Sequence, residues 1–366
     1  MKKRVIIFGK FDIVHPGHIS FIKHAQSLGQ VTVVLESDQT IRGQKGYRTF
    51  YNNKIRQQNL ARLGLDIYLH DQQTKEQILA DLNPDIILLC QDQEFLLGMF
   101  KNTKSPQVVI HQLMNPGLFK SSRLRPVLEN GQSAIYLIDK PKGDNSFKAV
   151  SVLRKILNIK KIGFAGTLDP LASGLLILAS SRATRLLDWF HFLPKVYEAD
   201  IIFGQTSETY DLESKPILNE KAKNFDRKYL ESRLKKFLGK QKQQVPIYSA
   251  TKVGGQKLHK LARRGEQVIA PFKTIEIYDL KIKKFKYPHL KLSVSCSAGT
   301  YIRSLVHDLG EVTGHGALLT DLRRLSIGDF SVKQALNLNQ VTAENLADCV
   351  ISPEQVIESL NQFFYQ

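Results

Sequence analysis

The feature that most constrains the fold is a regular alternation of short apolar runs and helical stretches over the first 111 residues. The apolar runs predict buried strands at 4–9, 31–37, 66–70, 85–90 and 107–111. Leu, Ile or Phe recur at three- and four-residue spacing over 17–28, 52–63 and 74–82, which predicts helices there. Apolar strands that alternate with helices are typical of a parallel sheet covered on both faces. The sequence therefore predicts an α/β domain with a Rossmann-like parallel sheet, whose ligands bind at the carboxyl ends of the strands.

The pattern changes after a break at 126–133 (PVLENGQS), where Asn130 and Gly131 form a turn dipeptide. The segments that follow are longer and mixed, which favours an α+β organisation for the second part of the chain. We therefore place a domain boundary at the break. The predicted parts are a first domain at 1–128, a second domain at 133–330 and a short C-terminal extension at 331–366.

Within the second domain, one segment predicts an amphipathic helix and three predict strands. The helix is 225–239, with Gly239 as its C-terminal stop and with four residues on its apolar face: Leu230, Leu234, Phe237 and Leu238. The strand-like runs are 197–203, 275–285 and 290–297. We expect the acidic tail after residue 330 to form a helical cap on this domain.

Positive charge is concentrated in the second domain. The chain has 52 Lys and Arg against 34 Asp and Glu, a net charge of +18, and residues 131–330 alone carry +15 of it. This distribution favours a polyanionic partner, most simply nucleic acid. A lysine-rich proteome would give the same excess, so charge alone does not decide the partner.

The sequence also bears on compartment and cofactors. No apolar run approaches the ~18 residues of a membrane span, and the apolar stretch after MKKR is too short for a signal peptide. We therefore expect a cytoplasmic protein without a membrane partner. The three cysteines (Cys90, Cys296 and Cys349) lack CxxC spacing, which argues against a disulfide framework and a cysteine-based zinc site.

A first chemical constellation, FGKFDIVHPGH, leaves the first predicted strand and opens the first helix. His15 and His18 are three residues apart, so both rings lie on one side of the helix start. Pro16 suits the first helical turn because its missing N–H group costs nothing there. Two imidazoles and unbonded backbone N–H groups at a helix N-terminus form a receptacle for phosphate, which suits nucleotidyl transfer.

This stretch resembles the cytidylyltransferase-like nucleotidyltransferase superfamily, over roughly residues 3–128. The matching positions are Gly9, Phe11, Asp12, His15, Gly17 and His18, then Arg56, Leu60, Leu63 and Asp66, and finally Ser121, Ser122 and Arg125. The resemblance implies that the two histidines grip nucleotide phosphates and that the late Ser-Ser-Arg group assists from another helix start. It also implies a nucleoside triphosphate, with magnesium, as the ligand of this domain.

Two departures from that family leave the activity of the first domain open. Lys10 stands where a small or hydroxyl residue is usual, and 114–119 lacks the usual lead-in to the phosphate motif. A nucleotide pocket retained without catalysis is the alternative to an active nucleotidyltransferase. The sequence does not identify the nucleotide or the acceptor.

A second constellation centres on Thr167-Leu168-Asp169-Pro170. The proline and the flanking Gly166 and Gly174 predict a rigid loop that holds the Asp169 carboxylate in place. Such a carboxylate can act as a nucleophile when a cation keeps it ionised, and Arg303 in GTYIR is the candidate cation. The candidate stacking surfaces for a base are Tyr197 and Tyr301.

Four stretches in order, 138–150, 163–187, 195–211 and 293–330, resemble the TruB family of tRNA pseudouridine synthases. The resemblance covers about 133–350 and implies a mixed-sheet catalytic domain that needs no cofactor or metal. It implies that Asp169 is the nucleophile, that Arg303 pairs with it, and that Tyr197 stacks on the base and handles protons. The implied partner is the T-arm of tRNA, with uridine 55 as target, and no obligate protein partner is evident.

Further residues of this resemblance are expected at the substrate. Lys140 belongs to the DKPKG stretch, and Tyr301 is expected in the same pocket as the nucleophile. At two positions the chain departs from the family: Phe164 replaces a histidine, and His259 replaces a tyrosine. We expect these two changes to alter rate or specificity without loss of function.

Three functions therefore compete. The first is a tRNA pseudouridine-55 synthase fused to a nucleotidyltransferase-like domain. The second is a CTP- or ATP-dependent nucleotidyltransferase whose second domain binds tRNA. The third is a non-catalytic tRNA-folding chaperone, which would keep tRNA binding after loss of Asp169.

Overall fold

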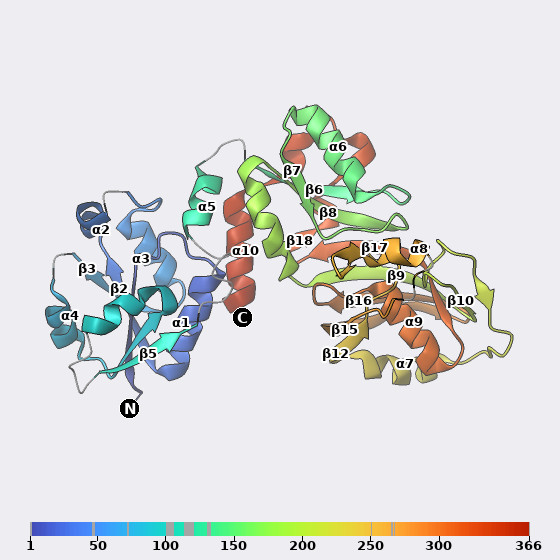
Figure 1. Ribbon diagram of the computed structural model, residues 1–366, viewed down its shortest axis with the longest axis horizontal. Helices are drawn as coiled ribbons and strands as arrows, with labels where there is room; N and C mark the ends of the chain where they lie inside the picture. The colour runs from blue at the N-terminus through green and yellow to red at the C-terminus, as the bar shows by residue number, and fades with distance from the viewer. Residues whose placement is uncertain are drawn as a thin grey trace. The chain divides into compact units, whose positions relative to one another are not determined.

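The computed structural model describes residues 2–45, 48–71, 73–99, 106–112, 121–129, 133–249, 251–264, 266 and 268–365. The chain forms two compact units (Figure 1). The first unit combines Met1–Gly131 with Pro353–Gln366, and the second is Gln132–Ser352. Within the described residues, no helix is both long and apolar enough to cross a membrane.

The first unit is built on a five-stranded parallel sheet of order β3-β2-β1-β4-β5. Its strands are β1 (Arg4–Gly9), β2 (Gln30–Glu36), β3 (Asp66–His70), β4 (Ile86–Cys90) and β5 (Gln107–His111). Its helices are α1 (Pro16–Leu28), α2 (Asp38–Lys45), α3 (Asn53–Ala61), α4 (Lys75–Leu82), the 3-10 segment η1 (Gln91–Met99), α5 (Ser121–Leu128) and α10 (Pro353–Tyr365). The predicted Rossmann-like sheet is confirmed.

Two apolar layers enclose this sheet. Helices α1 and α3 pack on one face through Phe21, Ile22 and Leu60, whereas α4 and η1 pack on the other through Ile78 and Leu96. Helix α2 was not predicted, because DQTIRGQK offers a single large apolar residue and so no helical periodicity. Both faces of the sheet are thus buried, which leaves its strand ends for ligands.

The structure differs from the prediction at the domain break and in the C-terminal tail. Pro126, where the predicted break begins, lies inside α5. The tail does not end as a cap on the second domain: α10 packs against α1 and α5 of the first unit. Figure 1 shows α10 lying beside α1. The reason is an apolar stripe on α10, formed by Val356, Ile357 and Leu360, which is buried there.

The second unit is built on a mixed sheet of eleven strands. The main path is β12-β15-β16-β9-β17-β8-β6-β19, with β18 on β17, β7 on β8 and β20 on β6. These strands are β6 (Ile135–Lys140), β7 (Ile162–Ala165), β8 (Ala172–Ser180), β9 (Lys195–Phe203), β12 (Gly239–Gln244), β15 (Phe272–Lys286), β16 (His289–Cys296), β17 (Ala317–Ile327), β18 (Phe330–Ser331), β19 (Leu336–Asn337) and β20 (Val350–Ile351). Two short ribbons pair β10 (Gln205–Thr206) with β11 (Ile217–Leu218), and β13 (Lys252–Val253) with β14 (Gln256–Lys257). The mixed sheet agrees with the prediction.

Helices cover this sheet in two groups. The helices of the second unit are α6 (Ser146–Leu157), α7 (Arg227–Leu234), α8 (Leu258–Arg263) and α9 (Ile302–Thr313). Its 3-10 segments are η2 (Ser181–His191), η3 (Lys235–Phe237), η4 (Val332–Gln334), η5 (Leu338–Gln340) and η6 (Leu346–Cys349). Helices α7 and α9 share a core with β9, β15, β16 and β17, whereas α6 packs over β6, β7 and β8. Figure 1 shows these two groups over different parts of the sheet.

The predicted helix 225–239 is shorter than expected and its apolar face is different. Leu230, Leu234 and Phe237 are buried as predicted, but Leu238 is exposed. The helix tightens into η3 and Leu238 has an extended backbone (φ −74°, ψ 143°). Its side chain therefore leaves the helical stripe, and Gly239 opens β12 directly after it.

Candidate active site

Asp169 lies in the loop between β7 and β8. The loop is fastened to the first residue of α6: the Ser146 hydroxyl accepts a hydrogen bond from the Leu168 N–H group and donates one to the Leu168 carbonyl, each at 3.0 Å. The Gly143 N–H group donates to the Pro170 carbonyl at 2.8 Å. The Asp169 side chain is 43% exposed. A rigid loop therefore presents a carboxylate to solvent, as the sequence predicts.

A buried arginine holds the other side of this loop. The Arg324 guanidinium on β17 donates to the carbonyls of Gly166 (2.8 Å) and Leu175 (2.7 Å). Gly174 pairs with Arg324 across β8 and β17 and has φ +103°. A Cβ atom at Gly174 would lie 2.3 Å from the Arg324 carbonyl oxygen, so only glycine fits this close approach. Sequence analysis did not single out Arg324, whose role depends on strand pairing.

Arg303, in the first turn of α9, reaches Asp169 from a different part of the chain. Its Nη2 atom lies 2.9 Å from Asp169 Oδ2, and its side chain is only 6% exposed. The same guanidinium donates to the carbonyls of Thr209 and Tyr248, each at 3.1 Å. The arginine is therefore fixed before any substrate arrives, and the predicted ion pair is present.

A second carboxylate faces the same arginine. Asp211 is fully buried, and its Oδ2 atom lies 3.5 Å from Arg303 Nη1. Its Oδ1 atom accepts hydrogen bonds from the Thr209 hydroxyl (2.5 Å) and the Glu213 N–H group (3.0 Å). One guanidinium thus bridges a buried and an exposed carboxylate. Sequence reasoning missed this role, although Asp211 ends the matched stretch 195–211.

Tyr197 lies on β9, directly opposite Arg324 of β17 in the strand register. The ring is buried in the core shared with α9. Burial raises the pKa of the Tyr197 phenol, while the Arg324 guanidinium acts in the opposite direction. The phenol is therefore protonated near pH 7, and can donate a hydrogen bond or a proton.

Tyr301 is the N-cap residue of α9, immediately before Ile302 and Arg303. Its backbone is held by the Gln243 side chain, which accepts from the Tyr301 N–H group (2.8 Å) and donates to the Tyr301 carbonyl (3.0 Å). Its hydroxyl lies 3.0 Å from the Thr251 hydroxyl. Gln243 of β12 thus holds the Tyr301 backbone, and Thr251 contacts its hydroxyl.

Three other expected substrate residues have different surroundings. Lys140 is fully buried, and its ammonium donates to the carbonyls of Pro141 (3.0 Å) and Asp144 (2.5 Å). Burial lowers the pKa of Lys140, whereas the charges of Asp144 and Asp169 oppose this. Phe164 on β7 packs, partly buried, against the core under α6. The His259 side chain, in α8, lies outside the described residues.

The two histidines of the first unit meet at the start of α1. His15 is the N-cap residue, and its Nδ1 atom accepts from the His18 N–H group at 3.3 Å. The rings stack with centroids 3.8 Å apart. Burial lowers the pKa of His18 to about 4, and burial with the adjacent His18 lowers that of His15 well below its usual range. Both rings are therefore neutral near pH 7, and the His15 ring proton is on Nε2.

Other positions of the nucleotidyltransferase resemblance are engaged within the fold. The Asp12 carboxylate accepts from the N–H groups of Phe50 and Tyr51, each at 3.0 Å. Arg56 is fully buried and donates to Asp38 at 2.7 Å and to the Lys10 carbonyl at 2.5 Å. These groups shape the loops around the histidines.

The remaining positions of this resemblance that were expected at the nucleotide are Gly9, Phe11, Gly17, Ser121, Ser122 and Arg125. A Cβ atom at Gly9 would lie 2.7 Å from the Phe11 ring, and Gly17 is buried in the first turn of α1. The side chains of Ser121 and Ser122 lie outside the described residues. Arg125, on α5, pairs with Glu129 at 2.7 Å. The structure therefore brings His15 and His18 together but leaves the contribution of the Ser-Ser-Arg group a prediction.

The histidine pair fits a phosphate ligand on two observations. Helix α1 has thirteen residues and begins at this pair, so its N-terminal N–H groups and dipole favour an anion. The Nδ1 atom of His18 is shielded from solvent and has no hydrogen-bond partner among the described residues. A ring nitrogen left unpaired at a helix start is consistent with a bound ligand.

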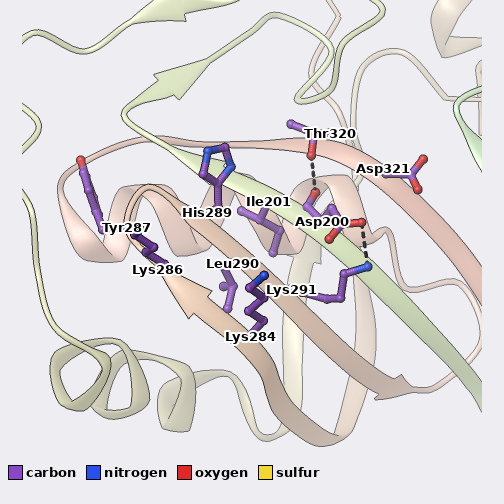
Figure 2. A pocket seen from close by; sticks show the side chains of 10 residues that line it. All are labelled: Asp200, Ile201, Lys284, Lys286, Tyr287, His289, Leu290, Lys291, Thr320 and Asp321. Atoms are coloured by element: carbon purple, nitrogen blue, oxygen red, sulfur yellow. Dashed lines mark hydrogen bonds and ion pairs between the residues drawn. The ribbon is translucent and has the colours of Figure 1, made fainter.

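A separate hollow of about 620 Å³ lies on the second sheet, at the end of β9 and β16 away from Tyr197. Figure 2 shows Lys291 directed toward Asp200, with which it pairs at 3.1 Å. Lys284 and Lys286 also line it, and no ion-pair partner for either occurs in the described part of the chain. The hollow therefore presents positive charge that has no ion-pair partner among the described residues, at the other end of β9 from Tyr197.

Sequence comparisons match both units to known families. The cytidylyltransferase-like family matches residues 6–105. The N-terminal domain of the TruB family pseudouridylate synthases matches 154–302, and the C-terminal domain of tRNA pseudouridylate synthase B matches 303–362. The first match ends before Ser121, so it does not include the late phosphate motif.

Individual relatives agree with these matches. A tRNA pseudouridine synthase B of Clostridium novyi (strain NT) is 40% identical over 235 residues, which cover 64% of this chain and 78% of that protein. One from Xanthomonas campestris pv. campestris (strain 8004) is 40% identical over 209 residues, 57% of this chain and 68% of that protein. A chain in the crystal structure of a Cbf5-Nop10-Gar1 complex superposes with a TM-score of 0.50 at 25% identity, covering 67% of this chain and 68% of the other.

Proposed function

The chain belongs to the TruB family of tRNA pseudouridine synthases and is a pseudouridine synthase, an isomerase. From this premise we propose that it converts uridine 55 in the T-loop of tRNA to pseudouridine. We propose Asp169 as the nucleophile. The observation that supports this proposal best is the fixed Asp169–Arg303 ion pair. Two relatives that are 40% identical to the chain are named tRNA pseudouridine synthase B.

The charges around Arg303 suit a nucleophile. Buried Asp211 already faces the guanidinium, and two backbone carbonyls accept its hydrogen bonds. The three charged groups together therefore carry one net negative charge, and Asp169 is the exposed member. An oriented carboxylate that remains anionic is what nucleophilic attack requires.

The proposed reaction rearranges bonds within one nucleotide. The Asp169 carboxylate acts on the ribosyl–base unit, the bond between N1 and C1′ breaks, and the uracil turns and rejoins through C5. The C5 proton is lost and N1 gains a proton, so no other reactant is consumed. We assign the stacking on the base and the handling of the proton to Tyr197, which is protonated and buried beside the Asp169 loop.

The target base must leave the T-loop before it reaches Asp169. Flipping a base out costs a few kcal/mol, which contacts to the RNA backbone can offset. The second unit supplies lysines for such contacts, among them Lys284 and Lys286, for which the described part of the chain holds no ion-pair partner. We place the T-arm phosphates along this basic surface.

The position of the product tests the proposal. Unmodified tRNA transcript is incubated with the full chain, treated with a carbodiimide that marks pseudouridine, and read by primer extension. We expect one new stop, at position 55, and none in a transcript with cytidine at that position. A stop elsewhere, or none, would contradict uridine 55 as the target.

We also propose a second activity for the first unit, nucleotidyl transfer from a nucleoside triphosphate with magnesium. The supporting observation is the neutral His15–His18 pair at the start of α1, where His18 Nδ1 has no hydrogen-bond partner among the residues that the structure describes. His15 Nε2, His18 and the α1 N–H groups would hold the phosphates. Each nucleoside triphosphate is tested for pyrophosphate release in the presence of tRNA. Release should be lost in His15→Ala and His18→Ala but kept in His24→Ala, and absence of release with all four nucleotides would contradict the proposal.

A further inference from the structure

The first unit contains a cavity of about 480 Å³ between the start of α1, the end of α3 and the C-terminal helix α10. Its volume lies in the range of small-molecule sites, about 300–1,000 Å³. The described residues that line it do not include His15 or His18, so it is distinct from the proposed nucleotide site. Neither family resemblance assigns a ligand to it.

Segments from the two ends of the chain build this cavity. The Asn361 side-chain amide on α10 donates to the Val14 carbonyl at 3.0 Å. The Tyr365 hydroxyl donates to the Leu63 carbonyl, just after α3, at 2.6 Å. These two bonds hold α10 across the cavity, so its shape is fixed at both sides.

Among the described lining residues, one side chain has an unsatisfied polar atom. Asn361 Oδ1 is buried and has no hydrogen-bond partner among the described residues. A buried acceptor without a donor is costly, and a ligand that donates an N–H group would remove that cost. The floor around it is apolar, with Ile13, Ile19 and Ile357 buried.

The mouth of the cavity is acidic. Glu354 and Glu358 are one turn apart on α10 and are both exposed, so their carboxylates lie on the same face. Arg62 carries the one positive charge among the described lining residues. The mouth is therefore net negative, although the chain as a whole carries +18.

The Tyr51 phenol, also in the lining, responds to these charges. Burial raises the pKa of Tyr51, and the carboxylates of Glu354, Asp12 and Glu358 raise it further. The same field that disfavours a phenolate favours a cation. Charge, size and the unpaired Asn361 oxygen thus agree on one class of ligand.

We propose that this cavity binds a small organic ammonium ion. Its apolar body packs against Ile13, Ile19 and Ile357, and its ammonium group lies near Glu354 and Glu358. An N–H group of the ligand donates to Asn361 Oδ1. This inference does not depend on either proposed activity.

The test compares two probes of the same shape, phenethylamine and 2-phenylethanol, by calorimetric titration of the full chain. The amine should bind at least about tenfold more tightly than the alcohol, because two carboxylates at a partly exposed mouth supply about that factor. The double variant Glu354→Gln/Glu358→Gln should lose this preference. Glu344→Gln, an exposed glutamate outside the cavity, should keep it.

A second variant checks the location. Asn59 is a half-buried lining residue on α3, so Asn59→Trp should fill the cavity and remove binding of both probes. Equal affinity for amine and alcohol would overturn the proposal. So would a preference for the amine that survives in the double-glutamine variant, or the absence of any amine binding to the unaltered chain.

Discussion

The two units assemble their candidate sites from different lengths of sequence. In the first unit, His15 and His18 come from a single turn of α1, and their stacking is a local consequence of the helix start. In the second unit, Asp169, Asp211 and Arg303 come from two loops and a helix that the sheet brings together. Their meeting requires the whole second unit to fold.

This difference has a physical consequence. A local motif keeps its geometry whenever its helix forms, so its presence alone says little about activity. A dispersed set is coupled, because each member fixes the others through buried charge and strand pairing. Disturbing the second site should therefore affect both stability and catalysis, whereas changes at the first site should remain local.

The largest effect is expected at Gly174. Gly174→Ala places a Cβ atom 2.3 Å from the Arg324 carbonyl at a positive φ, so it should destabilise the second unit by about 3 kcal/mol or more. The single tryptophan, buried Trp189, reports unfolding of that unit by fluorescence in urea. Gly314→Ala, at a helix end with open space around it, should cost only about 1 kcal/mol. Equal losses for the two variants would contradict the close-approach argument.

The next effect is expected at Asp211. Asp211→Asn leaves Arg303 buried with one fewer negative charge, so it should destabilise the second unit by about 2 kcal/mol. The unbalanced guanidinium should also hold Asp169 more tightly and lower kcat by about tenfold or more. Asp139→Asn breaks the more exposed pair with Arg323 and should cost less than about 1 kcal/mol. An unchanged kcat in Asp211→Asn would contradict the claim that Asp211 influences catalysis through Arg303.

The first unit should lose stability as the pH falls, because of His18. The pKa of His18 is about 4 in the folded chain and about 6.5 when unfolded. Between these values the unfolded state takes up a proton that the folded state does not, so stability is complete above pH 6.5 and falls as the pH is lowered toward 4. Hydrogen exchange of β1 against pH measures this.

Two variants sharpen that measurement. His18→Asn should weaken the pH dependence of β1 protection, because the residue no longer titrates. His289→Asn, an exposed change in the second unit, should leave it unaltered. The same pH dependence in all three proteins would mean that His18 is not its source.

The smallest effect is expected for the lysines of the hollow in Figure 2. Lys284→Ala/Lys286→Ala should weaken tRNA binding a fewfold and lower the salt slope of log Kd by about 1–2, because each lysine neutralises about one phosphate. The kcat should not change, since the hollow lies away from Tyr197. An unchanged salt slope would contradict the proposal that these lysines contact tRNA phosphates.

Local patterns predicted the first unit well. The limits of its five strands follow from continuous apolar runs, and the helix start at His15 follows from Pro16 and the strand before it. Helix α2 escaped prediction because its residues are almost all polar. Residues at a strand–loop–helix junction can be placed from sequence because their neighbours in space are their neighbours in the chain.

Contacts between distant segments could not be predicted in the same way. Asp169 and Arg303 were paired from motif resemblance, but the buried Asp211 and the anchoring Arg324 depend on strand register, which no local pattern reports. The packing of α10 on the first unit is a further case, because its apolar stripe does not say which surface it covers. Such features follow only from the assembled sheet.

The central claim is that Asp169 is the nucleophile of a pseudouridine synthase, and tritium release tests it most directly. Unmodified tRNA transcript that carries 5-tritiated uridine is incubated with the full chain, with Asp169→Asn, and with Asp279→Asn, a surface pair, as control. We expect release of one tritium per tRNA by the unaltered chain and by the control, and none by Asp169→Asn. Release by Asp169→Asn would contradict the account, as would tRNA binding without release by the unaltered chain, which would favour a folding chaperone.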